Sequence, residues 1–127
     1  MSKVLLIEPN AVLARVYMQA LQHAGHTAAY ANNAQDAIDA TDEFVPDVIV
    51  LELQLAVHDG IEFLHELRSY AEWQRLPVII NTHITPDALM HVKNVLEQDL
   101  GVKAWLYKPR TSLQQLISAV NEQAVSA

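Results

Sequence analysis

Side chains able to do chemistry follow four short apolar segments of the sequence. They are Glu8, Glu52, Thr82 with His83, and Lys108. Two carboxylates, a hydroxyl, an imidazole and an ammonium could together bind a cation, bind an oxyanion, or neutralise one another. Pairing of Lys108 with Glu8 and Glu52 is the simplest expectation, because charged groups that perturb one another often form structural networks.

The sequence lacks the motifs that identify several common classes of enzyme. Its three glycines, Gly25, Gly60 and Gly101, all lie at expected helix boundaries, which excludes a dinucleotide fingerprint and a P-loop. No serine ends an expected strand, so a nucleophile elbow is not indicated. The chain has no Cys, which removes disulfides, thiolate metal sites and a cysteine nucleophile. We therefore expect that the protein is not an enzyme.

Apolar runs and amphipathic segments alternate five times along the chain and position these side chains. The expected strands are residues 4–7, 26–31, 47–53, 78–80 and 102–107. Residues 48–51 are apolar on both faces, as is typical of a central strand in a covered parallel sheet. Helical periodicity follows each strand. The predicted N-caps are Asn10, Asn32 or Asn33, Asp59, Thr85, and Thr111 or Ser112.

Helical spacing also predicts which positions face the core. The stripe predicted for the first helix is Leu13, Val16, Tyr17, Ala20, Leu21 and Ala24. The stripe predicted for the second is Ala34, Ala37, Ile38 and Thr41. The spacing of Leu89, Val92, Leu96 and Leu100 predicts one continuous fourth helix that ends at Gly101.

Five strand–helix units in 127 residues predict one α/β domain, a doubly wound parallel sheet with helices on both faces. Such sheets bind ligands at the carboxyl ends of their strands. The residues at those ends are therefore the candidate functional residues. We expect a single domain over residues 1–127.

Charge is unevenly distributed along the chain. Asp and Glu total 15 against 8 Lys and Arg, a net charge of −7. No Lys or Arg lies between Arg15 and Arg68, a stretch that holds nine acids. An acidic chain without basic runs argues against direct nucleic-acid binding. No apolar run approaches the roughly 20 residues of a membrane helix, and no signal peptide is indicated, so we expect a cytoplasmic protein.

The sequence resembles the receiver domains of response regulators. Residues 47–53, followed by Asp59-Gly60, are similar to the central strand and following loop of that family. Residues 3–8, 77–82 and 101–109 fall where its other signature strands lie. The resemblance covers essentially the whole chain. It implies a flavodoxin-like (βα)5 three-layer sandwich that serves two-component or phosphorelay signalling, either as a whole protein or as the first domain of a longer regulator.

In that family an Asp after the third strand accepts a phosphoryl group from a kinase histidine, and Mg²⁺ is held by this Asp and an acid pair after the first strand. The resemblance places Glu52 at the acceptor position and Glu8 at the first acid. Thr82 and Lys108 match the residues that contact phosphoryl oxygens. Trp105 matches the aromatic that reports the switch state, and Pro109 matches a proline that follows a cis peptide bond.

Three residues depart from the family pattern. Glu52 replaces Asp, Pro9 replaces the second acid, and His83 replaces a small residue. The carboxylate of Glu52 lies one methylene further out, and misplacement of about 1 Å can cost about a hundredfold in rate. Pro9 removes a Mg²⁺ ligand. We therefore expect an atypical receiver that acts independently of phosphorylation, has no cofactor, and binds Mg²⁺ weakly or not at all. Glu52 could reach Lys108 and Thr82 and stand in for a phosphoryl group.

The resemblance also implies an interaction face on the fourth helix, fifth strand and fifth helix. Lys103, Trp105, Pro109 and Arg110 are the candidate switch and interface residues. A protein partner, an effector domain or a second copy of the chain would dock there. The segment between Thr82 and Lys108 is about one helical turn longer than is usual for the family, with the added length around residues 94–100.

Two alternatives stay open from the sequence. The first is a working phosphoacceptor that uses Glu52 with weakened metal binding. The second is a divalent-metal-binding α/β domain that uses Glu8, Glu52 and His83, with His58 as a further ligand, because imidazole and carboxylate suit Zn²⁺. His23 and His26, which lie on either side of Gly25, are expected to be solvated.

Overall fold

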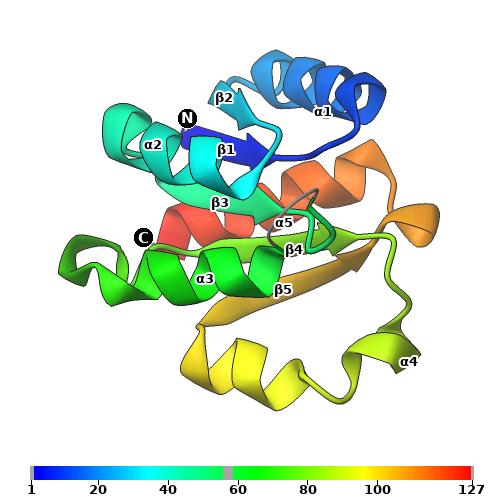
Figure 1. Ribbon diagram of the computed structural model, residues 1–127. Coiled ribbons are helices and arrows are strands. Elements are labelled where there is room, and N and C mark those ends of the chain that lie inside the picture. Colours follow the sequence, from blue (N-terminus) through cyan, green and yellow to red (C-terminus); the bar gives the residue numbers. More distant parts are fainter. Residues whose placement is uncertain (1, 56–58, 127) are drawn as a thin grey trace.

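The computed structural model describes residues 2–55 and 59–126 and contains a five-stranded parallel sheet (Figure 1). The strands lie in the order β2-β1-β3-β4-β5. Their bounds are β1 Lys3–Ile7, β2 Thr27–Ala31, β3 Val48–Leu51, β4 Val78–Thr82 and β5 Val102–Tyr107. Because the order reverses between β1 and β3, the chain is doubly wound, and the predicted fold class is confirmed.

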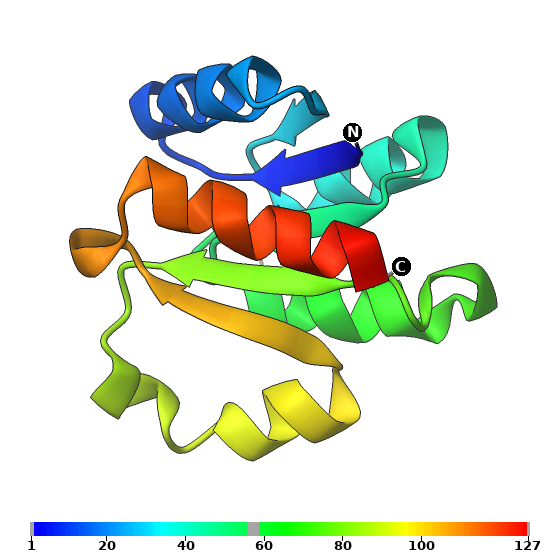
Figure 2. The ribbon, with the colours of Figure 1, turned by 180° about the vertical axis from the view of Figure 1, so that it is seen from behind.

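Helices cover both faces of the sheet. Their bounds are α1 Ala11–His23, α2 Ala34–Phe44, α3 Gly60–Ser69, α4 Pro86–Leu89 and α5 Leu113–Ser126. Figure 2 shows α1 and α5 on one face, and Figure 1 shows α2 and α3 on the other, with α4 below β5. Single 3-10 turns, at Ala71–Trp73 and Lys108–Arg110, precede β4 and α5. No helix among the described residues is long and apolar enough to cross a membrane.

The alternating side chains of the strands form a core on each face. In β1, Val4 and Leu6 pack toward α1 and α5, whereas Leu5 and Ile7 pack toward α2 and α3. All four are at most 1% exposed. This division follows from the two-residue period of a strand, and it leaves the strand ends as the places where polar side chains can gather.

Side-chain caps begin the helices where the sequence predicted. The choices that the sequence left open are resolved, because Asn33 accepts from the N–H of Asp36 and Ser112 accepts from the N–H of Gln115. The other predicted caps, each accepting a backbone N–H, are Asn10, Asp59 and Thr85.

The core-facing stripe of α1 differs from the predicted one. Ala14 and Leu21 are buried, and Tyr17 and Met18 pack beside them. Val16, which was predicted to face inward, is 39% exposed. Both stripes have helical spacing, so periodicity could not choose between them; contact with β2 and α5 selects the stripe that starts at small Ala14. The stripe predicted for α2 is confirmed in full.

The predicted continuous fourth helix is wrong. α4 ends at Leu89, turns follow, and a π-helix spans Val95–Asp99. A π-helix fits more residues into a turn than an α-helix. Leu96 and Leu100 are buried as predicted, at 0% and 3% exposure. The wider turn therefore absorbs chain length in the segment where the sequence indicated an excess, while these two leucines remain on the sheet.

Val45, immediately after α2, adopts left-handed backbone, with φ 53°. A β-branched residue is strained there, because its side chain crowds the backbone. Pro46 disfavours right-handed helical backbone at the residue before it, so the helix ends at Phe44, before Val45. The side chain of Val45 is 63% exposed and contributes little packing in return.

The predicted cis bond before Pro109 is wrong, since the described residues contain no cis peptide bond. Lys108, Pro109 and Arg110 instead form a single 3-10 turn that is closed by the N–H of Thr111 on the carbonyl of Lys108, at 3.2 Å. This turn starts directly after β5 and fixes the base of the Lys108 side chain.

Candidate functional site

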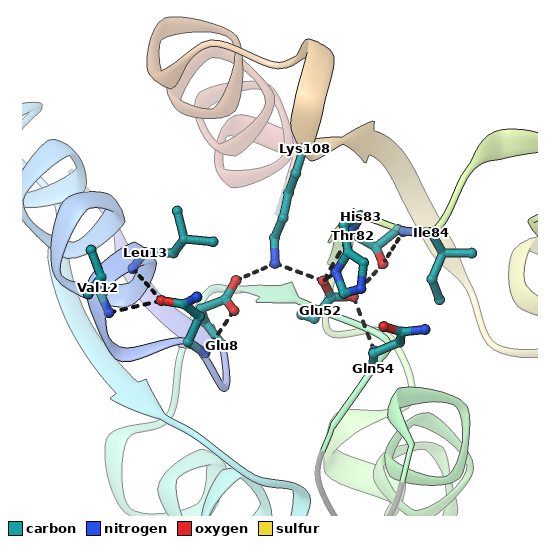
Figure 3. Close-up of polar contacts among 10 residues, drawn as sticks. Glu8, Val12, Leu13, Glu52, Gln54, Thr82, His83, Ile84 and Lys108 are labelled. Atoms are coloured by element: carbon teal, nitrogen blue, oxygen red, sulfur yellow. Dashed lines mark hydrogen bonds and ion pairs between the residues drawn. The ribbon is translucent and has the colours of Figure 1, made fainter.

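The five candidate side chains meet at the carboxyl edge of the sheet (Figure 3). Glu8 follows β1, Glu52 follows β3, Thr82 ends β4 with His83 after it, and Lys108 follows β5. Because β1, β3, β4 and β5 are neighbours in that order, their ends lie side by side. Parallel pairing therefore gathers residues that are up to a hundred positions apart in the sequence.

Lys108 forms the centre of the site. Its Nζ lies 2.6 Å from Oε1 of Glu8 and 2.7 Å from Oε1 of Glu52. Glu8 is 2% exposed and Glu52 1%, and the Lys108 side chain is 9% exposed. The ammonium thus bridges two buried carboxylates that come from different strands. The pairing proposed from the residue types is present.

The carboxylate of Glu52 accepts hydrogen bonds on both oxygens. Oε1 accepts from Nζ of Lys108, and lies 2.8 Å from Nδ1 and 3.3 Å from the backbone N of His83. Oε2 accepts from the Thr82 hydroxyl and from the backbone N–H of Gln54, the latter at 3.1 Å. These contacts join Glu52 to β4, to β5 and to its own loop.

The pKa of Glu52 lies below its ordinary value. Burial acts to raise this pKa, but the hydrogen bonds from Lys108, Thr82 and Gln54 and the charge of Lys108 outweigh burial. The pKa of Lys108 is raised: burial acts to lower it, and the bonds and charges of Glu52 and Glu8 outweigh burial. Glu52 and Lys108 therefore stay charged in the interior at neutral pH.

Backbone groups hold the remaining polar atoms in place. Oε2 of Glu8 accepts from the N–H of Asn10 at 3.1 Å, and Asn10 in turn caps α1. The hydroxyl of Thr82, which donates to Glu52, accepts from the N–H of Ile84 at 3.2 Å. The N–H groups of Asn10 and Gln54 were missed by sequence reasoning, because a backbone donor leaves no signal in residue type.

The site does not present a ligand set that suits a divalent ion. The Oε1 atoms of Glu8 and Glu52 both contact Lys108, and their Oε2 atoms accept N–H or O–H donors. Pro9 supplies no side-chain oxygen. The part of the chain that the structure describes holds no group of three or more His, Cys, Asp or Glu arranged for a metal. His58, the further zinc ligand considered from the sequence, lies outside the described residues.

A pocket of 380 Å³ lies beside the charged cluster. Leu13 and Tyr17 of α1 line it, together with Pro9 and Pro109 and the polar side chains of the site. His83 stands at this rim with its side chain 55% exposed. The pocket therefore gives solvent a route to the imidazole, while the Glu52 carboxylate below stays buried.

Trp105 lies on β5 and packs against the core on the α2 and α3 side. Its indole N–H donates to Oε2 of Glu97 at 3.2 Å, and Glu97 lies on the π-helix. A pocket of 280 Å³ separates α4 from β5, with Leu89, Met90 and Trp105 among its lining residues. The Glu97 contact was missed because it depends on the π-helix.

Two exposed basic side chains come from β5 and the turn after it. Lys103 and Arg110 are exposed, and the guanidinium of Arg110 lies 5.9 Å from the ring centre of Tyr107. Trp105 and Arg110 both line a second pocket, with Leu106 and Tyr107 between them in the sequence.

The expectation that His26 is solvated is wrong, whereas His23 is exposed as expected. His26 is 8% exposed, and its Nε2 lies 2.7 Å from Oδ1 of Asn121 on α5. Its Nδ1 accepts from the backbone N–H of Ser2 at 3.2 Å, so Nε2 carries the proton. The ring joins Ser2, the residue before β1, to α5 at the edge of the sheet opposite the charged cluster.

Comparisons with known proteins agree on one family. The family model of the response regulator receiver domain matches residues 4–121. The alginate biosynthesis transcriptional regulatory protein AlgB of Pseudomonas aeruginosa is 25% identical over 97% of this chain and 26% of its own length. The KDP operon transcriptional regulatory protein KdpE of Escherichia coli is 29% identical over 86% of this chain and 45% of its own length. The chain thus spans less than half the length of these relatives.

Solved structures share the fold at low identity. The chemotaxis response regulator CheY4 of Vibrio cholerae has a TM-score of 0.84 and 23% identity, covering 97% of this chain and 98% of that one. A sensor protein from Polaromonas sp. JS666 has a TM-score of 0.88 and 19% identity, covering 98% and 96%.

Proposed function

The chain belongs to the response regulator receiver domain family, and we propose that it is an atypical member that signals without phosphorylation of Glu52. Membership makes it a receiver domain of two-component signalling. The observation that carries the proposal is the bonding of the Glu52 carboxylate, which is 1% exposed and accepts from Lys108, Thr82, His83 and Gln54.

The bonding of Glu52 leaves it poorly placed as a phosphoacceptor. A phosphoryl acceptor must bring an oxygen lone pair in line with the phosphorus of the donor. Both oxygens of Glu52 are buried under donors from β4 and β5, and exposed His83 lies over Oε1. Freeing either oxygen would break hydrogen bonds to a charged acceptor, and freeing Oε1 would also remove one of the two carboxylate partners of Lys108.

The same contacts support a role for Glu52 as a substitute for the phosphorylated state. Lys108 and Thr82 are the residues that the family uses to hold a phosphoryl group, and here both hold the carboxylate. The substitution is partial, since a carboxylate offers one charge and two oxygens against roughly −2 and three oxygens for a phosphoryl group. The proposed consequence is a domain kept in one conformation.

The proposed output is protein–protein contact on β5 and the elements beside it, α4 and α5, which we call the docking face. Trp and Arg are enriched among residues that dominate binding energy. Trp105 lines the apolar pocket beside α4, and it lines a second pocket together with Arg110, from the turn between β5 and α5. Exposed Lys103 lies on β5. The proposed partner is a protein, an effector domain or a second copy of the chain, without nucleic-acid contact or catalysis by this domain. The alternative of a metal-binding domain is less well supported, because the described residues hold no group of three or more His, Cys, Asp or Glu arranged for a metal.

The test of Glu52 uses a small acyl phosphate with Mg²⁺ and intact mass spectrometry. We expect no gain of a phosphoryl group by the wild-type chain, because the carboxylate is enclosed. The Glu52→Ala variant controls for labelling elsewhere. A phosphoryl adduct on the wild type that Glu52→Ala lacks would overturn the proposal and restore the phosphoacceptor alternative.

Sedimentation velocity over a range of concentrations tests the second copy as partner. Self-association that Arg110→Glu weakens, and that Arg15→Glu on exposed α1 leaves unchanged, would support a homodimer on the docking face. A monomer at every concentration would restrict the partner to another protein.

A further inference from the structure

The Lys108 ammonium lies where two buried carboxylates from neighbouring strands converge. Glu8 Oε1 and Glu52 Oε1 approach the same nitrogen, at 2.6 and 2.7 Å. Two carboxylates in a poorly hydrated site repel one another and need a cation between them. That cation is commonly a bound metal; here it is a side chain of the protein (Figure 3).

We propose that Lys108 is the resident cation of this site, so that the domain holds its charged cluster together without a divalent ion. The inference rests on the proposed function and adds to it the reason for metal independence. The ammonium is covalently attached to the chain, and the 3-10 turn Lys108–Arg110 fixes the base of its side chain. The cation therefore cannot dissociate or be removed by a chelator.

The arrangement of donors suits an ammonium and not Mg²⁺. An ammonium has three N–H donors, whereas Mg²⁺ demands about six oxygens at roughly 2.0–2.1 Å in octahedral geometry. The carboxylates offer one oxygen each toward the centre, since both Oε2 atoms accept donors from the loops or from Thr82. Pro9, between Glu8 and Asn10, adds no oxygen ligand from its side chain.

Charge opposes the exchange of Lys108 for a metal. A divalent ion would have to enter beside an ammonium that is 9% exposed, or displace it from both of its carboxylates. The first arrangement sets like charges against each other at low dielectric, and the second leaves a buried charge without a partner. His83, whose Nδ1 already contacts Glu52, adds a further group that a metal would have to move.

The experiment measures Mn²⁺ binding by electron paramagnetic resonance, with the full chain at neutral pH. We expect no saturable binding to the wild type or to Lys108→Arg, which keeps a cation. Lys108→Met keeps the length of the side chain and removes the charge, so it should gain saturable Mn²⁺ binding that the wild type lacks. The double variant Lys108→Met/Glu8→Gln should lose that gain.

Thermal unfolding supplies the second measurement if Lys108→Met folds poorly. We expect Mn²⁺ to raise the melting temperature of Lys108→Met and to leave that of Lys108→Arg unchanged. Saturable binding by the wild type, or a Lys108→Met variant that neither binds nor is stabilised by Mn²⁺, would overturn the inference. Phosphoryl labelling of Glu52 would overturn the proposed function instead, so the two failures are distinguishable.

Discussion

Replacing Glu52 by Gln tests whether its carboxylate holds the carboxyl edge of the sheet together. Glutamine keeps the shape of the side chain but has one oxygen and one NH2 group. Whichever way the amide sits, its NH2 faces either Lys108 and the backbone N–H of His83 or Thr82 and Gln54, which donate to Glu52 in the wild type. One set of donors therefore loses its acceptor.

The expected loss of stability is about 3 kcal/mol at pH 7. A hydrogen bond to a charged group contributes about 1.5–3 kcal/mol, and an unsatisfied buried donor costs about 1–3 kcal/mol. Removal of one partner of a buried ion pair typically costs about 3–5 kcal/mol, but here Lys108 keeps Glu8 at 2.6 Å. The estimate lies at the low end of that range for this reason. It leaves the domain folded, since domains of this size are stable by about 5–15 kcal/mol.

The difference between the two proteins should shrink in acid. The pKa of Glu52 is lowered in the folded state, so as the pH falls below about 4.3, the unfolded state takes up a proton before the folded state does. The stability that Glu52 contributes is present above that pH and is lost as the pH falls through the folded-state pKa. The loss proceeds at no more than about 1.4 kcal/mol per pH unit. The Gln variant has no titrating group at this position, so its free energy of unfolding should fall less steeply as the pH is lowered.

Urea unfolding followed by circular dichroism at pH 7 and at several lower values measures both effects. Glu66→Gln is the matched control, because Glu66 is exposed on α3 and should change stability by less than about 0.5 kcal/mol. If Glu52→Gln unfolds at the same urea concentration as Glu66→Gln at pH 7, the Glu52 carboxylate does not hold the carboxyl edge of the sheet together and the reasoning fails.

Three further substitutions, one of them with a matched control, test the backbone and the core, each by urea unfolding. Val45→Gly should stabilise the domain by about 0.5–1 kcal/mol, because the left-handed φ of 53° favours glycine; destabilisation would mean that the exposed Val45 side chain packs. Gly60→Ala should cost about 1–3 kcal/mol, since the added Cβ would lie 2.8 Å from the Leu53 Cα; an unchanged midpoint would contradict this contact. Leu96→Ala should cost about 2–5 kcal/mol and Val95→Ala less than about 0.5, because Leu96 is 0% exposed and Val95 39% exposed; equal losses would place the π-helix in another register.

The sequence predicted where the functional side chains lie because each one stands at a change from apolar to polar residues. That change ends a strand, and parallel pairing brings the strand ends together. Val102–Tyr107 was predicted to the residue, and Glu8, Thr82 and Lys108 were placed at the edge where the structure has them. These predictions needed only the alternation of apolar and polar residues along the chain and the parallel pairing of the strands.

The features that were not predicted depend on contacts between distant parts of the chain. Neither the donation of the Asn10 N–H to Glu8 nor the burial of His26 against Asn121 leaves a mark in local residue spacing. The rotation of α1 toward Ala14 is decided by its neighbours, and the π-helix arises where Leu96 and Leu100 both have to reach the sheet. Pro109 was expected to follow a cis bond through resemblance, and the 3-10 turn at Lys108 replaces it.

The two tryptophans of the chain form a pair of optical reporters at separate places. Trp73 is 9% exposed, its ring lies 4.8 Å from that of Tyr70, and its carbonyl accepts from Arg68. Trp105 instead reports on the π-helix Val95–Asp99, through its bond to Glu97. In the single-tryptophan variants Trp73→Phe and Trp105→Phe, each fluorescence trace would follow one region alone. A binding partner that shifts the emission of Trp105 and leaves that of Trp73 unchanged would locate its footprint without a label.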